Sequence, residues 1–406
     1  MLLVTILTLT MLGGSMAFAE NIHEKLTIEQ ATAIADKWRE NNYDQEVTIK
    51  ETIPVYDYDD EISAYSISFH KNEEDCGYVV INAGLNQNTF REFSLTGKDA
   101  YSRIKNTIQN MNGSVLEKKL YESDFYNYAV EISKAGKKYF AVSDGRLETN
   151  DYVQKVKTVY SKLKQYFTKK EDSLESQNYL EGIIRGDDSV FNGLGSCTSK
   201  DILGMSTIRS AVERGTYMYP YMQQDFYTNG GEGHENTGNC APTAATHIIG
   251  YYYLGRGKSN LISNFDPFDY LFPVYDVIVN YSGFDRSYIG EKGITDIAAT
   301  DAIKKYAKDK GYSNSTSKYW FNLWSDFKRD LDNNYPVFTS IKGNTVTSSG
   351  STVKRGHAIV SIGYRIYSSG AKYLNVIDGH NEDLNRFINF DDSRFDYVNG
   401  VVVKID

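Results

Sequence analysis

Residues 238–245 read Gly-Asn-Cys-Ala-Pro-Thr-Ala-Ala, and this stretch decides how the rest of the chain is interpreted. Gly238 permits a tight turn. Pro242 suits a first helical turn, where its missing N–H leaves no hydrogen bond unmade. Apolar residues then recur at helical spacing. The pattern predicts a buried helix that begins at or just after Cys240 and runs through Tyr253.

A cysteine at the start of a helix has a specific chemical use. The free backbone N–H groups and the macrodipole at a helix N-terminus favour the thiolate. The thiolate is the form that attacks a carbonyl carbon. A small buried hydrophobe is the ordinary role of a lone cysteine, but the surroundings of Cys240 favour a nucleophile. Such a nucleophile needs a base, and the base needs a group that orients it.

Two later runs supply candidates for the base and the orienting group. His357 begins the buried run GHAIVSIGY, whose core requires no polar residue at that position. Asp378 ends the next strand-like run, YLNVID. Two adjacent antiparallel strands would hold His357 and Asp378 side by side. The alternatives for the orienting group are Asn375 and Asn381.

An oxyanion hole needs hydrogen-bond donors as well. The backbone N–H of Cys240 is one expected donor, because it lies at the helix end. The second donor is expected from a side chain just upstream, and the sequence leaves its identity open. The candidates are Asn239, Asn236, His234, Gln224 and Gln223.

The order NCAPTAA, helix, GHAIVSIGY and VIDG resembles the papain-like cysteine peptidases of bacteria. It is most similar to the bacteriocin-leader-processing peptidase-like and streptopain-like families. The resemblance covers about residues 236–380. It implies that Cys240 is the nucleophile, that His357 is the general base and that Asp378 orients the histidine. It also implies a protein or peptide substrate and no cofactor.

The C-terminal half, residues 200–406, is expected to form an α+β domain in which the nucleophile-bearing helix packs on an antiparallel sheet. Helices are predicted at 240–253, 294–308 and 320–332. Strands are predicted at 337–341, 358–364, 373–377 and 401–405. Trp320 and Trp324 would then lie four residues apart on one helix, as core or cleft wall.

The first 19 residues have the pattern of an export signal. An apolar run, Leu2–Leu12, precedes Ala17-Phe18-Ala19, the small-x-small pattern that a signal peptidase reads. We therefore expect a secreted protein, with cell-surface association as a variant of that expectation. No later apolar run is long enough to span a membrane, so no membrane contact is expected after signal removal.

Residues 20–150 are predicted to form an α+β domain of their own. A helix is expected over 27–41, with Thr27 and Gln30 as a capping box, followed by strands and by a second helix over 99–109. The segment GYVVINA at 77–83 resembles a strand motif of streptopain-type propeptides. That resemblance implies a propeptide acting as an intramolecular inhibitor. Residues 151–199 are interpreted as a connector with a cuttable loop.

Composition excludes several other classes. The 406 residues carry a formal net charge of −9, which argues against a general nucleic-acid binder. Three cysteines argue against a disulfide framework. His234, Cys240 and His247 lack metal-ligand spacing, so no metal site is predicted. The alternatives are an amidase, deamidase or acyltransferase with the same triad, and a catalytically inactive surface-binding protein.

Overall fold

The computed structural model describes two parts of the chain in detail. The described residues are 25–84, 89–110, 113–143, 147–151, 153–154, 157, 197–201, 239–263, 271–285, 293–319, 323–346, 352–367, 370–378 and 386–406. We call residues 25–157 of this set the N-terminal part and residues 197–406 the C-terminal part. The predicted signal segment and most of the predicted connector therefore lie outside the described residues.

The N-terminal part is a sheet with two helices. The helices are α2 (Ile28–Asn42) and α3 (Ala100–Asn110). The strands are β1 (Thr48–Tyr56), β2 (Ile62–Lys71), β3 (Glu74–Asn82), β4 (Phe90–Ser94), β5 (Ser114–Val115), β6 (Leu120–Glu122), β7 (Tyr128–Lys134), β8 (Lys137–Val142) and β9 (Leu147–Thr149).

The C-terminal part has a helical layer and a long sheet. The helices are α9 (Cys240–Leu254), the 3-10 turn η1 (Ser259–Leu261), α10 (Phe272–Ser282), α11 (Asp296–Asp309) and α12 (Trp324–Asp332). The strands are β10 (Cys197–Asp201), β11 (Asn314–Tyr319), β12 (Val337–Val346), β13 (Thr352–Tyr367), β14 (Lys372–Ile377), β15 (Arg386–Asn389) and β16 (Tyr397–Ile405).

Local signals explain where the first helix begins. The Thr27 side chain accepts a hydrogen bond from the Gln30 backbone N–H, and the Gln30 side chain accepts one from the Thr27 N–H. This is the predicted capping box, and it is confirmed. The buried face of α2 consists of small and branched residues around Trp38, which is fully buried. Trp38 stacks on Phe69 of β2 with ring centroids 5.7 Å apart.

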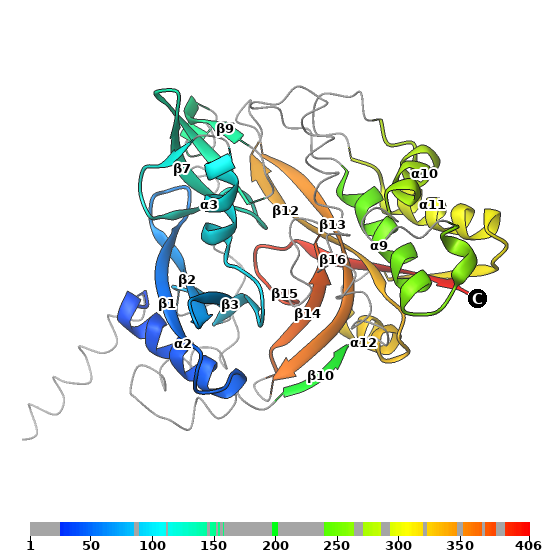
Figure 1. Cartoon of the computed structure of the whole chain (residues 1–406), viewed down its shortest axis with the longest axis horizontal. Helices are drawn as coiled ribbons and strands as arrows, with labels where there is room; N and C mark the ends of the chain where they lie inside the picture. The colour runs from blue at the N-terminus through cyan, green and yellow to red at the C-terminus, as the bar shows by residue number, and fades with distance from the viewer. Residues whose placement is uncertain are drawn as a thin grey trace, which may run out of the picture.

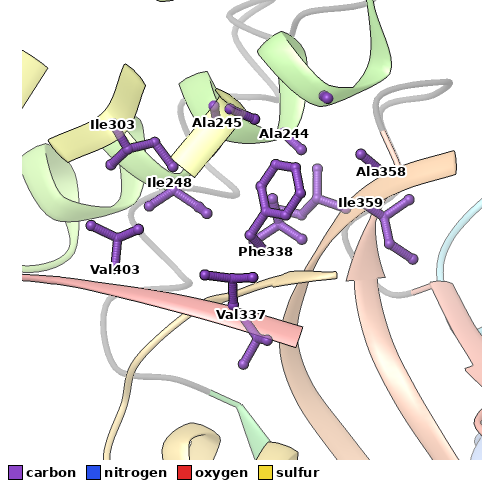
Figure 2. Packing of buried hydrophobic residues seen from close by; sticks show 14 of the residues in the cluster. Ala244, Ala245, Ile248, Ile303, Val337, Phe338, Ala358, Ile359 and Val403 are labelled. Atoms are coloured by element: carbon purple, nitrogen blue, oxygen red, sulfur yellow. The ribbon is translucent and has the colours of Figure 1, made fainter. Parts of the chain in front are cut away.

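Helix α9 is buried on almost every side, which is typical of a helix at the centre of a domain. Figure 2 shows Ile248 of α9 packed with Ile303 of α11, Phe338 of β12 and Val403 of β16. In Figure 1, α9, α10 and α11 lie on one side of β12 and β13, and the N-terminal part lies on the other. The start of α9 is thereby fixed against the sheet.

A single sheet of the described strands runs through both parts of the molecule. Its order is β11-β16-β12-β13-β14-β15-β4-β3-β2-β1-β6-β7-β8-β9. The link is the antiparallel pair β15–β4, in which Phe387 lies opposite Phe93. These two rings stack with centroids 4.8 Å apart, and both are buried. The mixed α+β class predicted from the sequence is confirmed, with one continuous sheet as the additional finding.

A second contact between the parts is a tight loop between β6 and β7. The Asp124 carboxylate accepts hydrogen bonds from the backbone N–H groups of Tyr126 (2.8 Å) and Asn127 (2.7 Å), which closes the loop into a turn. The turn carries Phe125 and Tyr126, and both join the hydrophobic core of the C-terminal part. Phe125 lies edge-on to Phe395, with centroids 6.1 Å apart.

Some elements differ from the prediction. Helix α12 begins at Trp324, later than predicted, and Trp320 lies outside the described residues. Helix α10 and strands β10, β11 and β15 were not predicted. The α10 segment, FPVYDVIVNYS, is rich in β-branched and aromatic residues, and a short apolar run of this kind does not distinguish a helix from a strand.

Gly343 on β12 gives a test of the contact between the two parts. A Cβ atom at this position would lie 2.4 Å from Phe125 Cγ and 2.7 Å from the Arg394 carbonyl oxygen. We expect Gly343→Ala to lower the free energy of unfolding by about 1–3 kcal/mol, because the tight loop must move. Urea denaturation followed by tryptophan fluorescence measures this change.

The matched control is Gly356→Ala on the neighbouring strand. There the nearest atom to a new Cβ is Lys342 Cγ at 3.5 Å, which is ordinary van der Waals contact. This control should stay within about 0.5 kcal/mol of the wild type. Equal losses for Gly343→Ala and Gly356→Ala would contradict the predicted role of the loop contact.

Candidate active site

Cys240 is the first residue of α9 and is partly buried. Burial raises the pKa of its thiol, and this is the largest effect on the group. The backbone N–H groups of Ala358, Ala241 and Cys240 itself lower that pKa, and the negative charge of Asp296 raises it. The helix N-terminus therefore lowers the pKa of the Cys240 thiol, as predicted, but the loss of water around the sulfur raises that pKa by more.

His357 is brought to the same place by β13. It is buried, and the next residue along the strand, Ala358, directs its backbone N–H at the Cys240 sulfur. The strand is long and is held on both edges, with Ile341 of β12 opposite His357. The Cys240 sulfur, at the start of α9, therefore lies against the backbone of β13 at the residue next to His357, although Cys240 and His357 are 117 positions apart in sequence.

The position of Asp378 follows from the register of β13 and β14. Val360 lies opposite Ile377, so one further step places Asp378 opposite Ile359. Alternate residues of a strand share a face, which puts Asp378 on the same face as His357. Asn375 lies opposite Gly363, an odd number of residues from Asp378, and therefore faces the other side. Of the orienting groups proposed from the sequence, Asn381 lies outside the described residues.

A buried cation holds the carboxylate of Asp378. Arg386 donates from Nη1 to Asp378 and from Nη2 to Glu92, the latter at 2.7 Å. The side chains of all three residues are at most 3% exposed. Charges this deep are tolerated only when they are paired. Glu92 belongs to β4 of the N-terminal part, so that part supplies one of the two anions around Arg386.

The tight loop of the N-terminal part covers the histidine. The ring of Tyr126 lies 4.9 Å from the ring of His357, at an interplanar angle of 38°. The guanidinium of Arg386 lies over the same tyrosine ring, 4.3 Å from its centroid. Tyr126 is 2% exposed. Tyr126 of the N-terminal part therefore contacts both His357, the predicted base, and Arg386, the cation that binds Asp378.

The oxyanion-hole candidates are only partly described. Asn239 is the N-cap of α9 and is buried, and its Nδ2 donates to the Tyr275 hydroxyl at 3.2 Å. Its Oδ1 is buried without a hydrogen-bond partner among the described atoms. The remaining candidates, Asn236, His234, Gln224 and Gln223, lie outside the described residues.

His247 lies under the site, two helical turns after Cys240. Burial lowers the pKa of its imidazole from 6.5 to about 4, although the charge of Asp378 acts in the opposite direction. His247 is therefore neutral at neutral pH. Among the described residues, no group of three or more His, Cys, Asp or Glu side chains is arranged to hold a metal ion.

Comparison with known proteins identifies the C-terminal part. Residues 217–397 match the model of the Peptidase_C39-like family. That stretch of the chain is therefore similar to the papain-like cysteine peptidases. Cys240, His357 and Asp378 all lie inside the matched range, which bears out the resemblance drawn from the sequence. No curated protein matches the chain. None of the described helices is both long and apolar enough to cross a membrane.

Several residues around this peptidase site could not be found from the sequence. Arg386, Glu92 and Tyr126 reach the site through pairings between distant strands, and Arg386 and Glu92 are 294 residues apart. Asp296 reaches it from the start of α11, where an acidic residue has an ordinary role at the helix N-terminus. A short motif with fixed spacing marks none of them.

The lowered pKa of His247 predicts an acid-dependent stability. Between pH 6.5 and about 4 the imidazole is protonated in the unfolded chain but not in the folded one. The free energy of unfolding therefore falls as the pH falls through this window, by up to ~1.4 kcal/mol per pH unit from this group. We expect His247→Gln to reduce that slope, measured by urea denaturation at a series of pH values.

The control is His70→Gln, which removes a histidine at the end of β2, far from the peptidase site. This variant should keep the wild-type dependence of stability on pH. A His247→Gln variant with an unchanged slope would show that other groups cause the acid sensitivity.

Proposed function

We propose that the chain is a secreted cysteine peptidase that is made as an inactive precursor. The observation that carries the proposal is the Ala358 N–H directed at the Cys240 sulfur, which places the start of α9 beside the strand residue that follows His357. This arrangement occurs within a range that matches a cysteine peptidase family. The apolar run before residue 20 supports secretion.

The proposed reaction is acyl transfer in two steps. The Cys240 sulfur, its proton passed to His357, attacks the carbonyl carbon of a peptide bond and forms a tetrahedral oxyanion. The imidazolium of His357 then gives the proton to the leaving amine, and the C–N bond breaks to leave a thioester. Water, deprotonated by His357, attacks the thioester and releases the carboxylic acid and the thiol. The backbone N–H of Cys240 stabilises the oxyanion.

Asp378 has the orienting role in this scheme. A carboxylate on the same face as the imidazole stabilises the imidazolium that forms during each proton transfer. Arg386 fixes this carboxylate by a charge-assisted hydrogen bond. The same cation reduces the negative charge that the imidazolium senses, so Arg386 tunes the basicity of His357 as well as the position of Asp378.

The N-terminal part is the proposed inhibitor of its own peptidase domain. Tyr126 lies on the His357 ring, and β4 continues the peptidase sheet through β15. A peptide substrate needs the space beside the imidazole that Tyr126 fills. Burial also raises the pKa of the Cys240 thiol, which favours the unreactive neutral form. Removal of residues from about 20 to 199 is expected to open the site.

The first test is intact mass against time on the purified full chain, with wild type beside Cys240→Ala. We expect the wild type to lose roughly its first half while the variant stays at full length. The new N-terminus then reports both the boundary and the first sequence cleaved. Wild type that stays at full length would exclude self-processing and favour an outside activator or a non-peptidase role, and equal cutting of both proteins would point to a contaminating protease.

A second test addresses inhibition by Tyr126. We expect Tyr126→Ala to increase the rate at which a peptide chloromethyl ketone alkylates Cys240 in the uncleaved chain, by about tenfold or more. The loss of the buried ring frees His357 and admits the reagent. Peptide mapping by mass spectrometry assigns the alkylated cysteine, since Cys76 and Cys197 are also present.

Tyr128→Ala is the matched control for this variant. Tyr128 is buried in the same part, two residues further on, but it packs in a separate core with Tyr78 and Val130. Both substitutions remove a buried tyrosine ring from the N-terminal part. Only Tyr126→Ala should accelerate alkylation. Equal acceleration by both variants would show that a general loss of stability, and not the removal of Tyr126 from His357, causes the effect.

A further inference from the structure

Asp296 is an acidic residue close to the nucleophile, and the triad chemistry does not use it. It is the first residue of α11, whose N-cap Thr295 accepts a hydrogen bond from the Ala298 N–H. The Asp296 carboxylate accepts a hydrogen bond of 2.5 Å from the Ser340 hydroxyl. Ser340 lies on β12, directly opposite Ala358 on β13.

This register places Asp296 near the reactive sulfur. Directly opposed residues on neighbouring strands present their side chains on the same face, so Ser340 and Ala358 share the face that α9 and α11 cover. Ala358 directs its N–H at the Cys240 sulfur, while Ser340 holds the Asp296 carboxylate. The negative charge of Asp296 acts on the thiol, whose pKa it raises. The sulfur and the carboxylate therefore lie over adjacent strands, at the starts of two neighbouring helices.

The charge of Asp296 is not compensated within the described residues. Its side chain accepts a hydrogen bond from the neutral Ser340 hydroxyl, and no ion pair among the described residues includes it. The comparable acidic residue in the first turn of α12, Asp326, is bonded to Arg329 at 2.7 Å. Asp296 is also partly exposed.

Helix stabilisation alone does not account for these features. An aspartate at the first position of a helix interacts favourably with the macrodipole, and Asp326 has the same opportunity in α12. A carboxylate beside the nucleophile, however, makes the thiolate less stable. The less stable thiolate slows the chemical step, and this loss is offset when the Asp296 carboxylate binds part of the substrate.

We propose that Asp296 determines specificity by binding a lysine or arginine side chain of the substrate, close to the bond that Cys240 attacks. The inference rests on the proposed peptidase function. The cation would form a charge-assisted hydrogen bond with the carboxylate. Its positive charge would also offset the effect of Asp296 on the thiolate, so a basic substrate improves both binding and attack.

The test compares peptides that differ only in the residues flanking the scissile bond, with lysine or arginine in one set and glutamine or methionine in the other. The full chain is incubated until its mass stops changing, and kcat/KM is measured for each set. We expect the wild type to favour the basic set. Asp296→Asn should lower kcat/KM for the basic set by about ten- to hundredfold and leave the neutral set unchanged or faster.

Two further variants sharpen the comparison. Asp326→Asn removes the equivalent charge from the first turn of α12 and should keep the wild-type preference. Asp296→Lys should shift the preference toward glutamate-containing peptides. A wild type that cleaves both sets equally, or an Asp296→Asn variant that slows both sets by the same factor, would overturn the assignment.

A paired labelling experiment separates this inference from the peptidase proposal. Two peptide chloromethyl ketones, one with lysine and one with glutamine beside the reactive group, are offered to wild type and Asp296→Asn. Faster labelling of wild-type Cys240 by the lysine reagent, lost in Asp296→Asn, supports both proposals. Equal labelling by the two reagents, together with peptide cleavage, refutes the role of Asp296 alone. A chain that shows no cleavage and no labelling would refute both the peptidase function and this inference.

Discussion

The guanidinium of Arg386 is the group on which the joining of the two parts depends. It is buried, it binds Asp378 of the peptidase domain and Glu92 of the N-terminal part, and it lies over the ring of Tyr126. A buried cation costs several kcal/mol of desolvation unless anions are placed around it. The pairing of β15 with β4 meets this requirement, because it sets Arg386 opposite Ser94 and brings Glu92 alongside. The backbone register and the charge pairing therefore require each other.

This coupling also bears on the proposed inhibition of the site. The Cys240 thiol is desolvated by burial, and the ring of Tyr126 lies against the ring of His357. Desolvation penalises the thiolate and the imidazolium, the two charged forms that the proposed reaction uses. In the proposed activation, departure of the N-terminal part would uncover the His357 ring and leave Arg386 with Asp378 as its anion. The surroundings of Cys240 and His357 would then favour the thiolate and the imidazolium, which burial now disfavours.

Local signals in the sequence were enough to predict much of the fold. The capping box of α2, the start of α9 at Cys240 and the core strand of His357 all depend on residues within a few positions of one another. The proposed triad was predicted from residues at or near buried elements, and the structure places Cys240 at the start of α9, His357 within β13 and Asp378 directly after β14. Because side chains alternate between the two faces along β14, Asp378 and Asn375 lie on opposite faces of the sheet. Such periodic patterns survive in the sequence because burial imposes them.

Contacts between distant segments left no comparable signal. Nothing in the residues around Glu92 indicates that it faces Arg386, and the turn at Asp124 looks like any surface turn until its tip is seen in the peptidase core. Which charged or aromatic residue is buried at an interface depends on the residues that it contacts across that interface. The side-chain donor of the oxyanion hole stays a prediction: Asn239 is described, and the other candidates, Asn236, His234, Gln224 and Gln223, lie outside the described residues.

Strand β10 restricts where the precursor could be cut to give a stable peptidase. It pairs with the end of β13, from Cys197 opposite Tyr367 to Asp201 opposite Gly363. Strand β12 pairs with β13 only as far as Ser361, so β10 continues the same edge where β12 leaves it. The predicted boundary at residue 200 falls inside this strand. A cut there would strip backbone partners from β13 and expose an edge that invites aggregation. Cleavage before Cys197 would keep β10 paired with β13, so the sheet of the C-terminal part would stay closed on that side.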